Sequence, residues 1–276
     1  GRPTGIDWFQ AGTGPYQAKS RQAGTSLLLE RTPTPHWSGV TPDFPEFEFR
    51  WQKEASTRLA GLLTGEIHVT SLPEDLLGQA EKQGQKTVPS QLPGLRVFFG
   101  FLCCFMNDFT DPSKGMYLPP EGQTPMMDIR VRKALNKAVD RNALNKAFFG
   151  GKGELMVVNH MHPSRPGWNP EYEKRFPEAY GYDPNAAKQI LADAGYGPNK
   201  PLQTKILISP SGSGQMQPLA MNEFLQQNLA EAGIKIDFEV VEWNTLINIW
   251  RAGAKHESSR GATGMNYSYF IQDPFT

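Results

Sequence analysis

The chain has 276 residues, enough for one large domain or two smaller ones, each with its own hydrophobic core. Its 28 Lys and Arg residues balance 28 Asp and Glu residues, so the basic excess typical of nucleic-acid-binding proteins is missing. No apolar run approaches the roughly 20 residues that a membrane-spanning helix needs.

The first third of the chain alternates short predicted strands with turns and loops. Residues 12–16 predict a turn that leads into a strand, and residues 26–31 predict a second strand. Residues 31–45 contain four prolines, which favour a loop. Aromatic residues then alternate with charged residues over 47–51, a pattern typical of a half-buried strand.

A helix is predicted next, over residues 54–63, with Gly65 well placed to end it. Residues 66–70 predict a strand, and the dense apolar stretch 96–105 predicts another. Residues 108–125 are rich in Pro, Gly, Asp and Ser and show no periodicity, so we place a boundary between two lobes there.

Three aspartates predict helix starts in the second part of the chain. Asp128 and Asp140 each precede a helical segment, and Asp183 precedes Pro184, a residue suited to the first helical position. Gly195 is the expected end of the third helix. We expect the apolar face of the first helix to contain Val131, Ala134, Leu135, Ala138 and Val139.

A strand–helix–strand unit is predicted after these helices. Residues 202–208 and 234–240 have strand patterns, and residues 216–232 have a helical pattern between them. We expect the helix to face inward with Leu219, Phe224 and Leu229. Short connections between these elements favour a parallel βαβ unit.

Few residues suggest catalysis or metal binding. His160 and His162 have a spacing that two metal ligands can use, but no Cys or carboxylate cluster is near in sequence, so a turn is the simpler interpretation. The adjacent Cys103 and Cys104 offer no disulfide framework. The segment 209–214 follows a strand and precedes a helix, which fits either an anion-binding loop or an ordinary connection. We expect no catalytic residues, no metal and no cofactor.

Several segments together resemble a known family, although each one alone is a weak indication. They are residues 12–16, 28–31, 60–67, 130–135, 140–141, 166–168, 183–196 and 241–243. In order and spacing they resemble the family 5 extracellular solute-binding proteins, the receptors of dipeptide-, oligopeptide- and nickel-type ABC importers. The resemblance implies an α/β fold with two lobes, like a type II, cluster C-like periplasmic binding protein, in which helices flank mixed sheets.

The resemblance also implies how the chain is divided. Residues 1–108 would form part of lobe I, residues 109–127 the inter-lobe connection, and residues 128–276 part of lobe II. By the family pattern we expect a fragment that lacks both ends. A protein of this kind captures a small solute between its lobes, delivers it to a membrane permease and catalyses nothing.

A departure from the family pattern bears on the ligand. Peptide-binding members resemble one another in placing an Asp four residues before the Pro of an acidic-Pro pair, where the carboxylate binds the peptide's α-ammonium. Here that pair is Asp273-Pro274, and Phe270 occupies the position of the Asp. A shift of one or two residues in this alignment is the alternative. The predicted ligand-binding residues are Phe105, Asn107, Tyr267, Tyr269, Phe270, Asp273, Trp168 and Trp243.

These residues predict an oligosaccharide, an opine-like conjugate or another non-standard peptide-like ligand, because aromatic side chains stack well on such groups. The alternatives are a dipeptide, oligopeptide or nickel receptor of the same family and, in another class, a metal-dependent hydrolase using His160 and His162. We expect the permease of an ABC importer as the partner, no nucleic acid, and a monomer when the protein is complete. The expected location is periplasmic or extracellular, with lipid anchoring left open.

Overall fold

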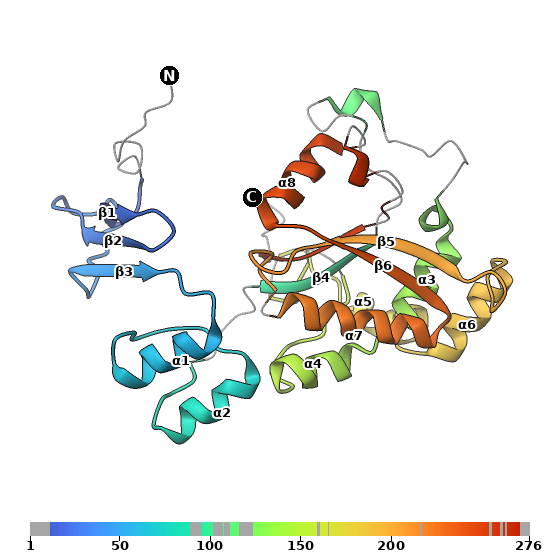
Figure 1. Ribbon diagram of the computed structural model, residues 1–276, viewed down its shortest axis with the longest axis horizontal. Helices are drawn as coiled ribbons and strands as arrows, with labels where there is room; N and C mark the ends of the chain where they lie inside the picture. Colours follow the sequence, from blue (N-terminus) through green and yellow to red (C-terminus); the bar gives the residue numbers. More distant parts are fainter. Residues whose placement is uncertain are drawn as a thin grey trace. The chain divides into compact units, whose positions relative to one another are not determined.

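The computed structural model (Figure 1) describes residues 12–88, 95–101, 107, 111–115, 124–158, 161–164, 166–215, 217–253, 256–259, 262 and 264–270. The side chains of residues 95–98, 101, 112, 265 and 267–270 lie outside this description. The chain divides into two compact units, Gly1–Thr87 and Val88–Thr276. The segment 109–127, predicted as the inter-lobe connection, falls within the second unit, and the boundary between lobes stays a prediction.

The first unit contains an antiparallel sheet of three strands in the order β1-β2-β3. The strands are β1 Tyr16–Gln22, β2 Ser26–Arg31 and β3 Glu46–Arg50. All three were expected from the sequence, but every residue of β3 is exposed, so the half-buried pattern predicted there is wrong. Phe47 and Phe49 of β3 pack edge to face, with ring centroids 4.7 Å apart.

Two helices follow the sheet in the first unit, α1 Ala55–Thr64 and α2 Glu74–Lys82. Gly65 ends α1 in the left-handed conformation at φ 76°, as its position after the apolar stripe predicts. The α2 helix was not among the sequence predictions. Leucine and alanine side chains form the small core of this unit: Leu59, Leu72 and Ala80.

The strand predicted over residues 66–70 is wrong. The backbone N–H of Ile67 donates to the carbonyl of Gly61, 2.9 Å away, so the chain folds back onto α1. A Cβ at Gly61 would lie 2.8 Å from Cδ1 of Ile67, which shows how closely the two residues pack. The apolar Ile67 therefore covers the end of a helix instead of joining a sheet.

The second unit is built on a four-stranded sheet in the order β4-β7-β5-β6. The strands are β4 Leu95–Phe101, β5 Leu202–Ile208, β6 Ile234–Val240 and β7 Gly264–Phe270. Strand β5 pairs in parallel with β6 and with β7, whereas β4 is antiparallel to β7. The predicted parallel βαβ unit is therefore confirmed, and the sheet is mixed.

Helices cover both faces of this sheet (Figure 1). The helices of this unit are α3 Ile129–Lys137, α4 Arg141–Phe149, α5 Glu171–Tyr180, α6 Pro184–Asp193, α7 Pro218–Glu231 and α8 Trp243–Ala252, of which α4 and α5 pack on α7 and α3. Apolar side chains of α3, α6 and α7 form the main core with β5 and β6. Leu207 points to the other face, where it packs with Leu246 and Ile249 of α8. Neither α5 nor α8 was predicted.

The three predicted aspartate caps are confirmed. Asp128 accepts a hydrogen bond from the backbone N–H of Arg130 at 2.8 Å. Asp140 and Asp183 each accept one from the N–H three residues later, at 2.9 and 2.8 Å. Each carboxylate satisfies an N–H group that the first helical turn leaves without an intrahelical partner.

Replacing Asp183 with Ala should therefore lower the free energy of unfolding by about 1 kcal/mol, because the cap bond to α6 is lost. Urea unfolding followed by circular dichroism measures this change. Asn185→Ala, an exposed change in the first turn of the same helix, is the control and should have a smaller effect. Equal effects of the two changes would contradict the capping role.

The inward face of α7 differs from the prediction. Leu219 is 43% exposed, and the buried residues are Pro218, Met221, Asn222, Leu225 and Leu229. Phe224 is half-buried. The buried stripe runs at helical spacing through a polar residue, Asn222, which concealed it from an analysis of apolar periodicity alone.

Strands β5 and β6 are joined on one face by an ion pair. Nζ of Lys205 lies 2.5 Å from Oε2 of Glu239. Burial alone would raise the pKa of Glu239, but hydrogen bonds from Lys205 and Ser258 and the nearby positive charges outweigh it and lower the pKa. The charged form of Glu239 is thus favoured by folding.

Because the folded pKa of Glu239 lies below its ordinary value of 4.5, its contribution to stability is present above that value and is lost as the pH falls through the folded pKa. Glu239→Gln should cost up to about 1 kcal/mol at pH 7, and the difference from wild type should shrink as the pH falls from 4.5 through the folded pKa. Urea unfolding at several pH values tests this, with exposed Asp237→Asn as the control. A pH-independent difference would contradict it.

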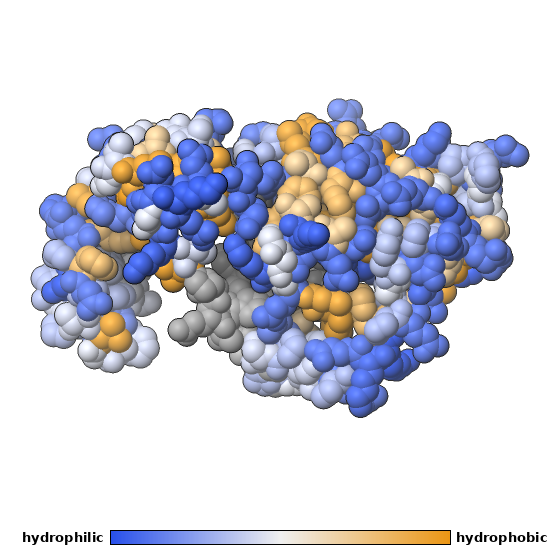
Figure 2. All heavy atoms as spheres, turned by 90° about the horizontal axis from the view of Figure 1, so that it is seen from below, coloured by the Kyte–Doolittle hydropathy of each residue, from blue (hydrophilic) through white to orange (hydrophobic). Residues whose placement is uncertain are grey.

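On the face shown in Figure 2, hydrophilic residues predominate, and hydrophobic residues form small groups among them. Within the described part of the chain, none of the helices combines the length and apolar character needed to cross a bilayer.

Candidate functional site

Strands β5, β6 and β7 of the second unit run in the same direction, so their carboxyl ends lie at one edge of the sheet. Ligands of open α/β sheets bind outside the carboxyl ends of the strands. We call residues 209–215, residues 241–243 and the end of β7 the carboxyl edge. The backbone N–H of Val241 donates to the carbonyl of Ile208 at 2.9 Å and holds the first two segments together.

The loop 209–215 has a compact conformation. Oγ of Ser209 donates to the carbonyl of Ser211 at 2.6 Å. Gly212 has φ +82°, and a Cβ there would lie 2.9 Å from Cβ of Trp243. Only glycine allows this approach, so the half-buried Trp243 packs directly on the loop backbone. The structure thus places the predicted ligand-binding residue Trp243 at the carboxyl edge.

Two helices begin at the carboxyl edge, and helix N-termini favour acceptor groups. The first turn of α8 is capped by Glu242, whose Oε2 accepts hydrogen bonds from the N–H groups of Asn244 at 2.7 Å and Thr245 at 3.2 Å. Gln217, at the N-cap of α7, makes no side-chain cap bond. The first N–H groups of α7 are therefore directed toward the edge without a side-chain cap from Gln217.

A chain of buried amides lies beneath the carboxyl edge. The N–H of Gly100 donates to Oδ1 of Asn266 at 2.9 Å, and Nδ2 of Asn266 donates to Oδ1 of Asn222 at 2.6 Å. Nδ2 of Asn222 donates to the carbonyl of Pro218 at 2.7 Å and to Oε1 of Gln215 at 3.3 Å. This amide chain connects β4, β7, α7 and the loop 209–215.

Two buried donors of the loop have no hydrogen-bond partner among the described residues: Oγ of Ser213 and Nε2 of Gln215. The two residues are 2% and 7% exposed. Neither loop segment of the edge contains Lys, Arg or His, and Glu242 is used as a helix cap. In its two loop segments, the edge therefore offers neutral hydrogen-bond donors and an aromatic ring.

Three other predicted ligand-binding residues belong to β7 by their backbone. Tyr267, Tyr269 and Phe270 pair with residues 98, 96 and 95 of β4, so they reach the carboxyl end of the strand. Their side chains lie outside the described part. The structure therefore brings their positions to the same sheet edge as Trp243.

The remaining predicted ligand-binding residues are not brought to this edge by any described contact. Asn107 fastens a loop, since its Nδ2 donates to the carbonyl of Lys114 and its N–H to that of Gly115, both at 2.9 Å. Trp168 packs edge to face with Tyr172 at the start of α5, with centroids 5.7 Å apart. Phe105 and Asp273 lie outside the described residues.

The histidine pair considered as metal ligands is described only at His162. Its ring lies 2.7 Å from Oγ of Ser164 and 2.9 Å from Oε2 of Glu154. His160 and the two cysteines lie outside the described residues. Among the residues that are described, no group of three or more His, Cys, Asp or Glu side chains could hold a metal ion.

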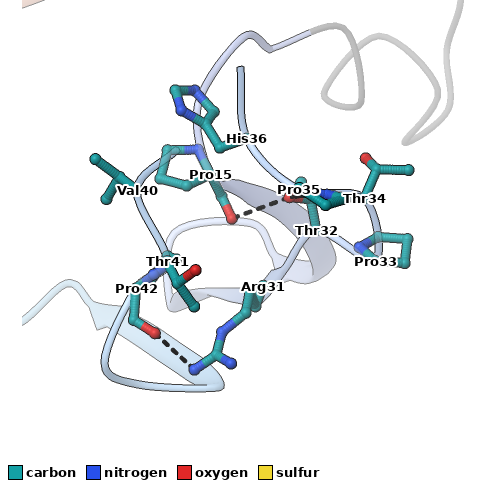
Figure 3. A pocket seen from close by; sticks show the side chains of 10 residues that line it. All are labelled: Pro15, Arg31, Thr32, Pro33, Thr34, Pro35, His36, Val40, Thr41 and Pro42. Atoms are coloured by element: carbon teal, nitrogen blue, oxygen red, sulfur yellow. Dashed lines mark hydrogen bonds between the residues drawn. The ribbon is translucent and has the colours of Figure 1, made fainter. Parts of the chain in front are cut away.

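Two cavities are lined by residues outside the carboxyl edge. The one in the first unit has a volume of about 190 Å³ and is walled by prolines of the loop 31–45 (Figure 3). Nη2 of Arg31 donates there to the carbonyl of Pro42 at 2.6 Å, so the guanidinium fastens the loop. The other, of about 270 Å³, is lined by residues of α3 and α5 together with Val157. The carboxyl edge remains the better candidate site.

Sequence reasoning missed the buried amides Gln215, Asn222 and Asn266. Asn222 could have been found as the one polar residue in the apolar stripe of α7. Asn266 gave no comparable indication, because its partner on α7 is 44 residues away in the sequence.

Comparisons with known proteins agree with this architecture. The model of the bacterial extracellular solute-binding proteins, family 5 (Middle), matches residues 3–273. The dipeptide-binding protein of Escherichia coli K12 is 26% identical over 268 residues, which are 96% of this chain and 45% of that protein. Nearly all of this chain is matched, but it spans only about half the length of such curated relatives.

Solved structures show the same fold. The periplasmic binding protein DppA of Helicobacter pylori, in complex with the peptide STSA, superimposes with a TM-score of 0.58 and 25% identity, covering 86% of this chain and 40% of that one. NikA of Brucella suis, in complex with Fe(III)-EDTA, gives a TM-score of 0.59 at 17% identity. The superposition covers 94% of this chain and 48% of that one. These neighbours are two-lobed periplasmic binding proteins, so the predicted α/β fold class is confirmed.

Proposed function

Because the chain belongs to the bacterial extracellular solute-binding proteins of family 5, we propose that it captures a small solute and delivers it to the permease of an ABC importer. The observation that supports this most strongly is the family match over residues 3–273. The protein would act by binding, with closure of two lobes around the solute, and not as an enzyme.

We propose that the solute is bound at the carboxyl edge of the second unit. The aromatic ring of Trp243 and the end of β7, with Tyr267, Tyr269 and Phe270, support this placement. Asp273, Phe105 and Asn107 stay proposed contacts, and Trp168 is a weaker candidate. Apart from Asp273, this set combines stacking surfaces with neutral hydrogen-bonding groups.

The ligand class proposed is an oligosaccharide, an opine-like conjugate or another non-standard peptide-like molecule. Phe270 stands where peptide-binding relatives have the carboxylate that pairs with an α-ammonium, and an aromatic ring cannot replace that ion pair. The two loop segments of the edge also lack a cation for a ligand carboxylate. Both observations favour recognition by stacking and neutral hydrogen bonds.

The proposed setting is the periplasm or the extracellular side of the membrane, with the permease as partner and no role for nucleic acid. A complete protein of this kind is proposed to be a monomer. Size-exclusion chromatography with light scattering on the full-length gene product tests that point, and a stable dimer would contradict it.

A thermal-shift screen of the full-length gene product tests the ligand class. The probes are dialanine, cellobiose, octopine and NiCl₂, each at several concentrations. A probe that binds only the folded protein raises the melting temperature, and at 100 times its dissociation constant it adds about 2.7 kcal/mol of stability. A shift with cellobiose or octopine and none with dialanine is the expected result.

The second candidate is a receptor for dipeptides, oligopeptides or nickel. Its similarity to the dipeptide-binding protein of Escherichia coli favours the dipeptide receptor among these. A clear shift with dialanine would show that the alignment at Phe270 is displaced, and a shift with NiCl₂ alone would favour a nickel receptor. The metal-dependent hydrolase considered from His160 and His162 is not supported, because the family is one of transport components.

A further inference from the structure

We propose that the buried pair Asn222 and Asn266 positions the carboxyl edge for solute binding. The pair would do so by holding the loop 209–215 and the end of β7 in one fixed arrangement. This inference rests on the proposed function, in that it takes the carboxyl edge as the place where the solute binds. It assigns a positioning role to two residues that would not touch the solute.

Burying two amides costs free energy, so filling the core does not by itself explain why asparagines occupy these positions. Asn222 and Asn266 are both 0% exposed, and Leu225 and Leu229 continue the same buried stripe of α7. A buried amide is tolerated when it is hydrogen-bonded, yet apolar residues of similar shape at both positions are often equally stable. What two leucines cannot provide is a directional connection between elements.

The hydrogen bonds of the pair allow a single orientation of each amide. The N–H of Gly100 can only donate, so it must face Oδ1 of Asn266. Nδ2 of Asn266 then faces Oδ1 of Asn222, which directs Nδ2 of Asn222 toward Pro218 and Gln215. Turning any one of these amides would set donor against donor or acceptor against acceptor.

This fixed orientation extends to both segments of the proposed site. Asn222 holds Oε1 of Gln215, so the unpartnered Nε2 of Gln215 is directed away from the pair. Gln215 closes the loop whose Gly212 packs against Trp243. Asn266 directly precedes Tyr267 on β7. A single buried pair therefore connects the proposed contacts on the loop with those on the strand.

The test is the double variant Asn222→Leu/Asn266→Leu in the full-length gene product. Hydrogen exchange measured by mass spectrometry should become at least about fivefold faster in residues 209–215 and 264–270, because the bonds that restrain both segments are lost. The melting temperature should fall, because the buried N–H of Gly100 loses its acceptor even though both positions stay filled. Affinity for the probe selected by the screen (cellobiose, octopine or dialanine), measured by calorimetry, should fall about tenfold.

Two further variants keep the result interpretable. Gln226→Met removes the bond from Nε2 of Gln226 to the carbonyl of Ile236, on the same helix, and should leave the exchange of both segments unchanged. Gln215→Met keeps the asparagine pair but removes its connection to the loop, so only residues 209–215 should exchange faster. If the double variant does not fold, Gln215→Met tests whether the pair restrains the loop 209–215.

The inference is overturned if the double variant and Gln215→Met exchange and bind like the wild type, since the pair would then only fill the core. It is also overturned if Gln226→Met loosens both segments equally. Failure of every probe to bind the wild type would contradict the proposed function, whereas the exchange measurement would still decide whether the pair positions the edge.

Discussion

Gly264→Ala should lower the free energy of unfolding of the second unit by about 3 kcal/mol or more. Gly264 is the first residue of β7, between β4 and β5. A Cβ at this position would lie 1.8 Å from the carbonyl oxygen of Gly100 and 3.0 Å from Cδ1 of Ile206. The first neighbour is backbone, which cannot rotate away, so the strands must separate and lose their pairing.

Urea unfolding followed by circular dichroism measures the effect of this substitution. Gly197→Ala is the matched control, because nothing lies within 4 Å of a Cβ built there. The control should stay within about 0.5 kcal/mol of the wild type. A Gly264→Ala protein as stable as the Gly197→Ala protein would show that β4 and β7 do not approach as the structure has them.

Leu225→Ala should cost about 3 kcal/mol, because it removes a fully buried side chain from the main core and leaves a cavity. Leu225 lies on α7, where it packs toward the sheet together with Leu229. The cost of such a cavity depends on how far the neighbours can move, and the surrounding strands and helices leave little freedom.

Leu219→Ala on the same helix is the control for this prediction. Leu219 is 43% exposed, so its truncation should cost less than about 1 kcal/mol. Chemical unfolding of the two variants under identical conditions compares the two faces of α7. Equal costs, or a larger cost for Leu219→Ala, would show that the helix presents the face predicted from the sequence instead.

Local patterns were sufficient to predict much of the fold. The aspartate before an apolar stripe, at Asp128, Asp140 and Asp183, located three helix starts because the side chain that satisfies the first turn is adjacent in sequence. The strands 202–208 and 234–240 followed from their apolar content and alternation, and their parallel pairing followed from the helix between them.

Features that depend on distant partners could not be predicted in this way. The strand expected at 66–70 failed because Ile67 packs against Gly61 of the preceding helix. The asparagine pair was missed because each residue alone looks like an ordinary polar residue. Only the contact between them, which the sequence does not show, distinguishes them. The position of Trp243 at the sheet edge, by contrast, follows from its place directly after a strand.

The pairing of β4 with β7 has a consequence for how the protein folds. The bond between Gly100 and Asn266 joins residues 166 positions apart in the sequence. Closing so long a loop costs conformational entropy before the contact can stabilise the fold. Strand pairing between such distant residues therefore forms slowly. The βαβ unit of β5, α7 and β6 is local and is expected to form first. During synthesis β4 must therefore wait for its partner until β7 has left the ribosome.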